Sequence, residues 1–410
     1  MLNRAQSHVR RQSENTRWMT EFRMAVSLHS HTHHSKESLG FFPHYIEYLH
    51  TPIVSEMLRA GMKRFEKSKS KELDFSRAYW TPPVTPGMVV KSEKKQIVET
   101  LGLNALVSVT DHDTIDGPLS LQREDASEAE APVSVEWTVP FADDTFHLGI
   151  HHLPAERAVD IMTELARYTN EPSGERLGEL LALLDGNPET LVVLNHPLQN
   201  ILRVGTAEHL ASLRRLLSMC RPWIHALEFN GMRSWKENLD VLRMAEDYDL
   251  PVVAGGDRHG CHASTVVNLS RGETWGEFVE GIRADRRSAI LTMTEYEEPA
   301  PLRELAIACD VLRHQPHGPY GKRRFTDRIF YNLEGYGWHP LSFYWDGGDG
   351  MPKWLGPAVT TLLVLGSEPC RMVMSWIFSR PEQFDRTRLP EENPACESEN
   401  RQTSVTAESE

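Results

Sequence analysis

The sequence of 410 residues has few cysteines and no long apolar run. Its five cysteines are an odd number, lie far apart and never form a C-x-x-C pair, which argues against a disulfide framework and a thiolate zinc site. The most apolar stretch, residues 355–378, is interrupted by Glu368, Pro369 and Arg371, so it falls short of the roughly 18 uncharged residues of a membrane span. No apolar signal-peptide core precedes the first predicted strand. We therefore expect a cytoplasmic protein with no membrane partner.

Positive charge is also scarce. The chain has 44 Lys and Arg residues against 58 Asp and Glu residues, which gives a formal net charge of −14. Because nucleic acids are polyanions, this balance does not indicate a nucleic-acid partner. The apolar and charged contents, 40% and 25%, are those of an ordinary globular protein, and they do not predict an oligomeric state.

Between about residues 24 and 294, short apolar runs rich in β-branched residues alternate with longer amphipathic stretches of helical period. This alternation is typical of parallel β/α units, and seven such strands in one series favour an α/β barrel over an open sheet. The expected strands are Ala25 to Leu28, Ala105 to Thr110, Val133 to Trp137, Phe146 to Ile150, Leu191 to Asn195, Ala226 to Phe229 and Val252 to Gly255.

The chain is predicted to consist of one barrel domain, residues 24–300, with segments attached to it. Residues 1–23 form an N-terminal extension, and residues 45–86 form an insertion, because they separate the first two strands by far more than a β/α unit needs. Residues 301–378 are expected to form a loop-rich C-terminal appendage of unknown role. Residues 379–410, acidic and poor in apolar side chains, are expected to be a disordered tail.

Many of the 19 histidines lie just after a predicted strand, where barrel enzymes collect their active-site residues. One histidine at a strand end is more often a hydrogen-bonded structural residue than a ligand. Six strand ends that carry imidazole or carboxylate, the ligands that suit zinc, manganese and iron, instead indicate a metal site. The motifs are His29-Ser30-His31-Thr32-His33-His34-Ser35, Thr110-Asp111-His112-Asp113, Glu136, His147-Leu148-Gly149, Asn195-His196-Pro197 and Gly255-Gly256-Asp257-Arg258-His259.

In their order and spacing, these motifs resemble those of the PHP (polymerase and histidinol phosphatase) superfamily, over about residues 24–294. The resemblance implies a distorted (β/α)7 barrel with two or three divalent metal ions, here Mn, Zn or Fe, and hydrolysis of phosphate esters. It also implies a ligand set in which Glu136 bridges two ions. The implied ligands are His29, His31, Glu136 and Asp257 for one metal, Glu136, His147 and His196 for a second, and His112 and His259 for a third.

Lys36 departs from the resemblance, because the family has an aspartate or histidine ligand of the third metal at this position. Two interpretations are open. In the first, which we favour slightly, the site is binuclear and the Lys36 ammonium supplies positive charge for the substrate phosphate. In the second, Glu37, His33 or His34 bends in and restores the missing ligand.

The expected substrate is a small phosphomonoester, such as a nucleotide or a sugar phosphate. Two metals activate a water molecule and clamp the phosphoryl oxygens, with Glu136 as the bridging carboxylate. If they are not metal ligands, His112 and His259 protonate the leaving oxygen or hold the phosphate.

Arg233 and Arg258 are candidate phosphate contacts, although ordinary surface arginines are an equally weighted interpretation. Asp111 and Asp113 are expected to fix the tautomer of a ligand imidazole. Two other functions stay open: hydrolysis of a C–N or carboxylic ester bond, and a non-catalytic PHP-like binding module.

Overall fold

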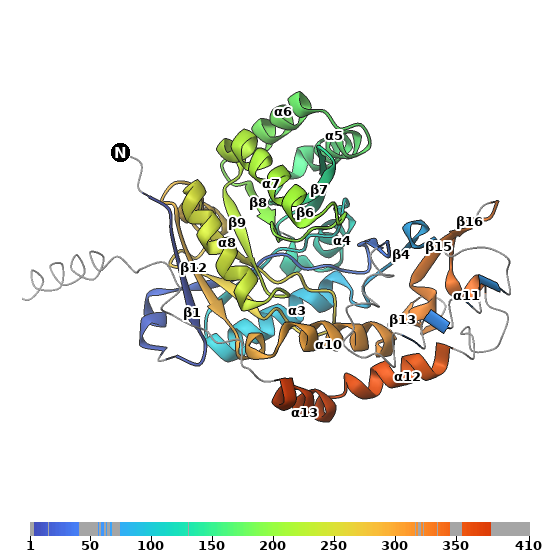
Figure 1. Cartoon of the computed structure of the whole chain (residues 1–410). Helices are drawn as coiled ribbons and strands as arrows, with labels where there is room; N and C mark the ends of the chain where they lie inside the picture. The colour runs from blue at the N-terminus through green and yellow to red at the C-terminus, as the bar shows by residue number, and fades with distance from the viewer. Residues whose placement is uncertain are drawn as a thin grey trace, which may run out of the picture.

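The computed structural model describes residues 4–14, 16–40, 56, 59–60, 63, 66–67, 74–129, 131–315, 317–318, 321–322, 324–333, 335–344 and 355–378 (Figure 1). The expected acidic tail, residues 379–410, lies outside them, as does most of the expected insertion. The mixed α/β class that the sequence predicts is confirmed. None of the described helices is both long enough and apolar enough to cross a membrane.

Two five-stranded sheets form the centre of the molecule, and together they contain all seven expected strands. The first sheet has the order β1 (Gln6–Arg11), β12 (Arg287–Thr292), β11 (Val266–Ser270), β2 (Met24–Ser27) and β5 (Asn104–Val107). The second has the order β10 (Val252–Gly255), β9 (Ala226–Asn230), β8 (Leu191–Asn195), β7 (Asp144–His151) and β6 (Val135–Phe141).

The expected uniformly parallel arrangement is wrong for β7, which runs antiparallel to both β6 and β8. Only residues 142 and 143 separate β6 from β7, and Ala142 has a positive φ of 55°. A two-residue connection suits a hairpin, whereas a parallel crossover needs a dozen or more residues. The strands β8, β9 and β10 are parallel, as predicted.

Two isolated parallel bridges join the sheets to each other. Ser30, after β2, pairs with Arg258, after β10, and His112, after β5, pairs with Glu136 in β6. Backbone hydrogen bonds reinforce the first junction, where the Gly256 N–H donates to the Leu28 carbonyl over 2.8 Å. These junctions bring the ends of strands from both sheets to one region, and a closed barrel of the seven strands stays a prediction.

The residues expected to form an N-terminal extension contribute a strand to the first sheet. β1 pairs in parallel with β12 along its whole length, and Val9 is its buried residue. The strands β1, β11 and β12 do not appear among the seven that the sequence predicts. The division of the chain into domains stays a prediction.

Helices cover the sheets, with α5, α6 and α7 gathered beside β6, β7 and β8 in Figure 1. In α6 the buried residues Leu177, Leu180, Leu181 and Leu184 follow the helical period, and the Ser173 hydroxyl caps the first turn by accepting from Arg176 N–H. The helices are α3 (Pro86–Gln96), α4 (Asp116–Glu124), α5 (Ala158–Asn170), α6 (Gly174–Asp185), α7 (Thr206–Cys220), α8 (Trp235–Tyr248) and α9 (Trp275–Arg283).

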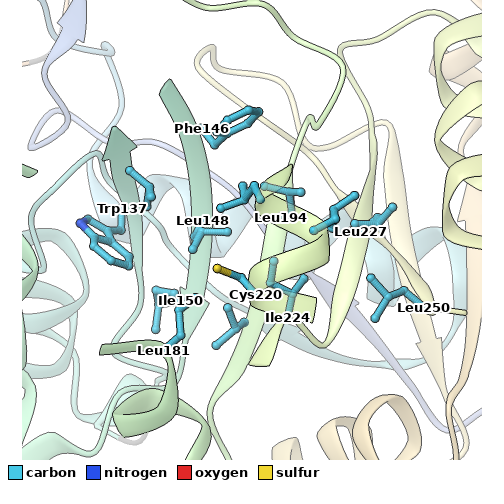
Figure 2. Close-up of a cluster of buried hydrophobic side chains, with 14 of the residues drawn as sticks. Trp137, Phe146, Leu148, Ile150, Leu181, Leu194, Cys220, Ile224, Leu227 and Leu250 are labelled. Atoms are coloured by element: carbon cyan, nitrogen blue, oxygen red, sulfur yellow. The ribbon is translucent and has the colours of Figure 1, made fainter. Parts of the chain in front are cut away.

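The largest apolar core lies between the second sheet and its helices (Figure 2). Leu148 and Leu194 from the strands meet Leu181 and Cys220 from the helices in this core. Trp137 is almost fully buried, and its indole N–H donates to Thr169 Oγ1 over 2.9 Å. This packing fixes the strands whose ends carry the predicted ligands.

A separate four-stranded antiparallel sheet combines the expected insertion with the expected appendage. Its order is β16 (Gly337–Pro340), β15 (Ile329–Leu333), β4 (Ala78–Trp80) and β3 (Glu37–Ser38). The expectation of a loop-rich appendage is wrong for the described residues, which form regular elements there. These are α10 (Ala300–Arg313), β13 (His317–Gly318), β14 (Gly321–Lys322), α11 (Leu341–Tyr344), α12 (Leu355–Leu365) and α13 (Glu368–Phe378), besides β15 and β16.

Arg328 connects this sheet to α10. Its guanidinium is almost fully buried and donates to the carbonyls of Thr81, at 3.1 Å, His314, at 3.3 Å, and Val311. The Arg328 carbonyl in turn accepts from the Thr81 N–H. One side chain therefore satisfies three backbone acceptors from two segments, one just after β4 and two at the C-terminal end of α10.

We expect Arg328→Met to lower the free energy of unfolding by about 2–4 kcal/mol, because buried carbonyls lose their donors. The matched control is Arg324→Met, since Arg324 lies four residues earlier with a side chain that is 39% exposed. The control should change the free energy by less than about 0.5 kcal/mol. Urea unfolding followed by tryptophan fluorescence measures both, and equal effects of the two variants would contradict the role of Arg328.

Candidate metal centre

The predicted ligands converge where β2, β5, β8 and β10 end, near the start of β6 and beside the middle of β7. His29 and His31 follow β2 and are buried, with side chains that are 1% and 0% exposed. The His31 N–H donates to the Arg258 carbonyl over 2.8 Å, which holds this loop against the one after β10. The structure thus brings together side chains that are more than 200 positions apart in the sequence.

Four of these side chains present one atom each to a common point. His29 Nε2 and His31 Nε2 are 3.1 Å apart, and they lie 3.1 Å and 3.2 Å from Glu136 Oε2. Asp257 Oδ1 lies 3.6 Å from both nitrogens. A tetrahedron with metal–ligand bonds of ~2.1 Å has edges of about 3.4 Å. These five distances are therefore close to those between ligands of one divalent ion.

The other oxygen of Glu136 faces a second pair of imidazoles. Glu136 Oε1 lies 3.0 Å from His196 Nε2 and 3.3 Å from His147 Nδ1, and it accepts a hydrogen bond from Asn195 Nδ2 over 3.0 Å. His147 Nδ1 is buried and has no hydrogen-bond partner among the described residues. Since a buried polar atom without a partner is costly, this nitrogen suits a role as a metal ligand. Glu136 thus has the arrangement of a bridging carboxylate.

A third group of atoms surrounds Glu37, which the sequence suggests only as a substitute ligand. Glu37 Oε2 lies 3.2 Å from His259 Nε2 and 3.3 Å from His112 Nε2, while Glu37 Oε1 lies 3.5 Å from His31 Nδ1. The four side chains come within the mutual distance that one metal ion requires. Glu37, and not Lys36, therefore completes the third group.

The structure does not support the preferred interpretation of Lys36. Lys36 is exposed, and its ammonium lies over the Tyr79 ring at 5.7 Å from the centroid. Lys36 directly precedes β3, and Tyr79, which its ammonium contacts, pairs with Ser38 on the face opposite Glu37. Because Glu37 faces the imidazoles, Lys36 points to the other side of the four-stranded sheet.

In the absence of metal, charge attraction shapes the protonation of these groups. Burial alone would lower the pKa of His112, but Glu136 and Glu37 raise it to about 9. Burial likewise opposes protonation of His259, yet Glu37 and Asp257 raise its pKa to about 9. Burial would raise the pKa of the Glu136 carboxyl, which the surrounding imidazoles instead hold well below its usual value. The cluster therefore attracts positive charge, which either protons or metal ions can supply.

Glu228, on β9, is a buried carboxylate that the sequence argument missed. Its Oε1 lies 2.5 Å from His29 Nδ1, and its Oε2 accepts from the His196 N–H over 2.7 Å. A Cβ on Gly255 would come within 1.6 Å of Oε1, so this close approach requires glycine. The available signal was that Glu228 is the one charged residue of an apolar predicted strand.

Asp111 and Asp113 position backbone rather than ligand imidazoles. The Asp111 carboxylate accepts from the Thr32 N–H at 2.5 Å and from the Thr32 hydroxyl at 2.8 Å, which fixes the loop after His31. The Asp113 carboxylate accepts from the Thr138 N–H over 2.8 Å. The expectation that these aspartates hold an imidazole tautomer is therefore not supported by their contacts.

The two arginines expected to contact phosphate differ in their surroundings. The Arg258 side chain is 3% exposed and pairs with Glu93 over 3.1 Å, and it also donates to the carbonyls of Gly260 and Cys261. These contacts give Arg258 a structural role in place of the predicted phosphate contact. Arg233 lies 4.0 Å from Glu237, and its suggested contact with phosphate stays a prediction.

Three of the candidate ligands have strained backbone conformations. His29, His196 and Asp257 have positive φ values of 62°, 28° and 50°. This region is unfavourable for residues with a Cβ and costs of order 1–3 kcal/mol at each position. Strain of this kind at three strand ends around one cluster indicates a functional site.

No protein-family model and no curated protein matches the chain. Three solved structures show a weak likeness at 16% sequence identity. A candidate metal-dependent phosphoesterase from Bifidobacterium adolescentis matches 44% of this chain and 84% of its own, with a TM-score of 0.28. An amidohydrolase from Chromobacterium violaceum with bound sulfate matches 43% and 83%, with a TM-score of 0.28. PsfC from Pseudomonas syringae matches 51% and 85%, with a TM-score of 0.35. Such low scores support neither a fold family nor an activity.

We expect Glu228→Gln to weaken the binding of Mn²⁺ by about 10- to 100-fold, because the carboxylate that accepts from a ligand imidazole raises the basicity of the imidazole. The matched control is Glu246→Gln, an exposed change on α8. Isothermal titration of the metal-free protein measures the dissociation constants. Equal affinities of the Glu228→Gln variant and the unchanged protein would contradict this role.

Proposed function

We propose that the protein is a hydrolase of phosphate monoesters that depends on divalent metal ions. The observation that carries the proposal is the geometry around Glu136, whose two oxygens face two groups of imidazoles. In one of these groups, five interatomic distances of 3.1–3.6 Å are near the edge length of a tetrahedral metal site. The strain at His29, His196 and Asp257 also supports a functional centre.

We assign three cations, of Mn, Zn or Fe, to the three groups of atoms. The third cation replaces the binuclear site favoured from the sequence, because Glu37 occupies the position of the missing ligand. The proposed ligands are His29, His31, Glu136 and Asp257 for the first cation, Glu136, His147 and His196 for the second, and Glu37, His112 and His259 for the third.

The charge balance favours a phosphate substrate over an amide or a carboxylic ester. Four carboxylates contact the candidate imidazoles, namely those of Glu37, Glu136, Glu228 and Asp257. Three divalent ions would therefore leave two uncompensated positive charges. A phosphomonoester carries about two negative charges at neutral pH, since its second pKa is about 6. A neutral amide or ester would leave this excess charge in a buried site.

When bound, the cations lower the pKa of a coordinated water molecule and neutralise the phosphoryl oxygens. Hydrogen bonds within the chain keep the proton of two imidazoles on Nδ1, which leaves Nε2 able to bind a cation. His29 Nδ1 donates to Glu228, and His259 Nδ1 donates to the Asp257 carbonyl over 2.9 Å. In both residues the Nε2 lone pair is then free to face the cluster. Asn195 holds Glu136 between the two groups.

We expect the purified protein to hydrolyse phosphomonoesters with Mn²⁺. His31→Ala and Asp257→Ala should lower kcat/KM on the order of 100-fold or more, because each removes a ligand. The control is His262→Ala, whose side chain is 74% exposed. The measurement is turnover of a panel of phosphomonoesters, phosphodiesters, amides and carboxylic esters. Turnover of amides or esters alone would refute the phosphate assignment, and bound metal without any turnover would favour a binding module.

We also expect about three metal ions per chain in the unchanged protein, and about two after Glu37→Gln, because that change removes the carboxylate of the third group. Lys36→Gln is the matched control on the adjacent residue, and it should leave the metal content unchanged. Elemental analysis of protein dialysed against Mn²⁺ measures the ratio. A loss of metal in Lys36→Gln, or none in Glu37→Gln, would contradict the assignment.

A further inference from the structure

The cluster is partly open to solvent. His29 and His31 are at most 1% exposed, whereas the side chains of His112, His147 and His259 are 15%, 13% and 18% exposed. Among these candidate ligands, the opening to solvent is therefore at the last three imidazoles, where a substrate can make contact. The residues beside these imidazoles determine which chemical groups, besides the phosphate, a substrate can have.

Trp80 lies at this opening. It pairs with Glu37 on β3 and with Ile329 on β15, and directly paired residues share one face of a sheet. Glu37 contacts His259, and the Trp80 ring lies 5.9 Å from the His259 ring, centroid to centroid, at an interplanar angle of 38°. The four-stranded sheet thus places an aromatic side chain beside the most exposed candidate ligand.

The contacts of Trp80 leave part of the indole available. Trp80 is half-buried, and it belongs to none of the four buried apolar clusters of the described residues. None of the hydrogen bonds among the described residues uses its N–H. A tryptophan that serves only packing usually buries its ring and pairs its N–H.

The neighbouring Tyr79 is used differently. It stacks on Phe330 at 4.9 Å between ring centroids, contacts Trp338 at the same distance and carries the Lys36 ammonium over its ring. These residues occupy the opposite face of the sheet from Trp80. Tyr79 is therefore a structural aromatic side chain, and it provides an internal comparison for Trp80.

We propose that Trp80 is a specificity-determining residue that stacks on a planar aromatic group in the alcohol portion of the substrate. This inference rests on the proposed function, and it narrows the substrate class to phosphomonoesters that carry a heteroaromatic base, such as nucleotides. Stacking of a base on an aromatic side chain contributes about 5- to 100-fold in binding. The unpaired indole N–H adds a donor for an acceptor on the base.

The test compares adenosine 5′-monophosphate with ribose 5-phosphate, which have the same type of phosphate ester and differ by the base. The unchanged protein with Mn²⁺ should show a kcat/KM about 5- to 100-fold higher for the nucleotide. Trp80→Leu should bring the ratio near one, mainly through a higher KM for the nucleotide. Trp80→Phe should restore part of the preference, and Tyr79→Leu should keep the ratio of the unchanged protein.

A ratio near one in the unchanged protein, or a ratio that Trp80→Leu does not change, would overturn the role of Trp80 without affecting the proposed function. Absence of turnover on both compounds and on every other phosphomonoester of the panel would instead refute the proposed function. In that case, equilibrium dialysis of adenosine 5′-monophosphate against the Mn²⁺-loaded protein still decides about Trp80. Weaker binding to Trp80→Leu than to Tyr79→Leu would support stacking, and equal binding would refute it.

Discussion

The buried carboxylate of Glu136 is the constraint on which the rest of the site depends. It is 1% exposed, and imidazoles from several strand ends surround both of its oxygens. A carboxylate removed from water costs several kcal/mol unless positive charge and hydrogen-bond donors compensate it. Protons on the imidazoles can compensate it in part, because Glu136 helps to raise the pKa values of His29 and His112 against the effect of burial. The buried carboxylate therefore requires nearby positive charge. This requirement accounts for the buried histidines around it and for Glu228, which holds His29 and His196 in place.

The convergence of the ligands was predictable because it depends on strands, and strands leave a local signal. An apolar run such as Leu191–Asn195 followed by His196 identifies both a buried strand and the polar side chain at its end. The role of Glu37 was harder to predict from the sequence, because it depends on whether Lys36 or Glu37 faces the cluster. That choice is set by the pairing of β3 with β4, whose residues lie about 40 positions away. Arg258 illustrates the same limit, since its partner Glu93 comes from α3, and no local pattern relates the two.

The strands that the sequence argument missed lack the local signal. β1 has the sequence QSHVRR, and Val9 is its one buried residue, so no apolar run marks it. The hairpin of β6 and β7 was expected as two parallel strands, because the predicted strands end at Trp137 and resume at Phe146, which hides the two-residue connection. The four-stranded sheet arises from segments about 250 residues apart, which no pattern in one segment can reveal. These differences concern long-range pairing, whereas the mixed α/β class follows from local periodicity.

The sheet that combines β3, β4 and β15 has a consequence for the biosynthesis of the protein. Glu37 is near the N-terminus, but its strand is supported by β4, and β4 in turn pairs with residues 329–331. A ribosome adds residues from the N-terminus onward, so about 300 further residues are made before this support exists. All the candidate ligands, the last of which is His259, are synthesised before residues 329–331. A nascent chain would therefore complete the buried group around His29 first and the group that contains Glu37 last, after most of the polypeptide has left the exit tunnel.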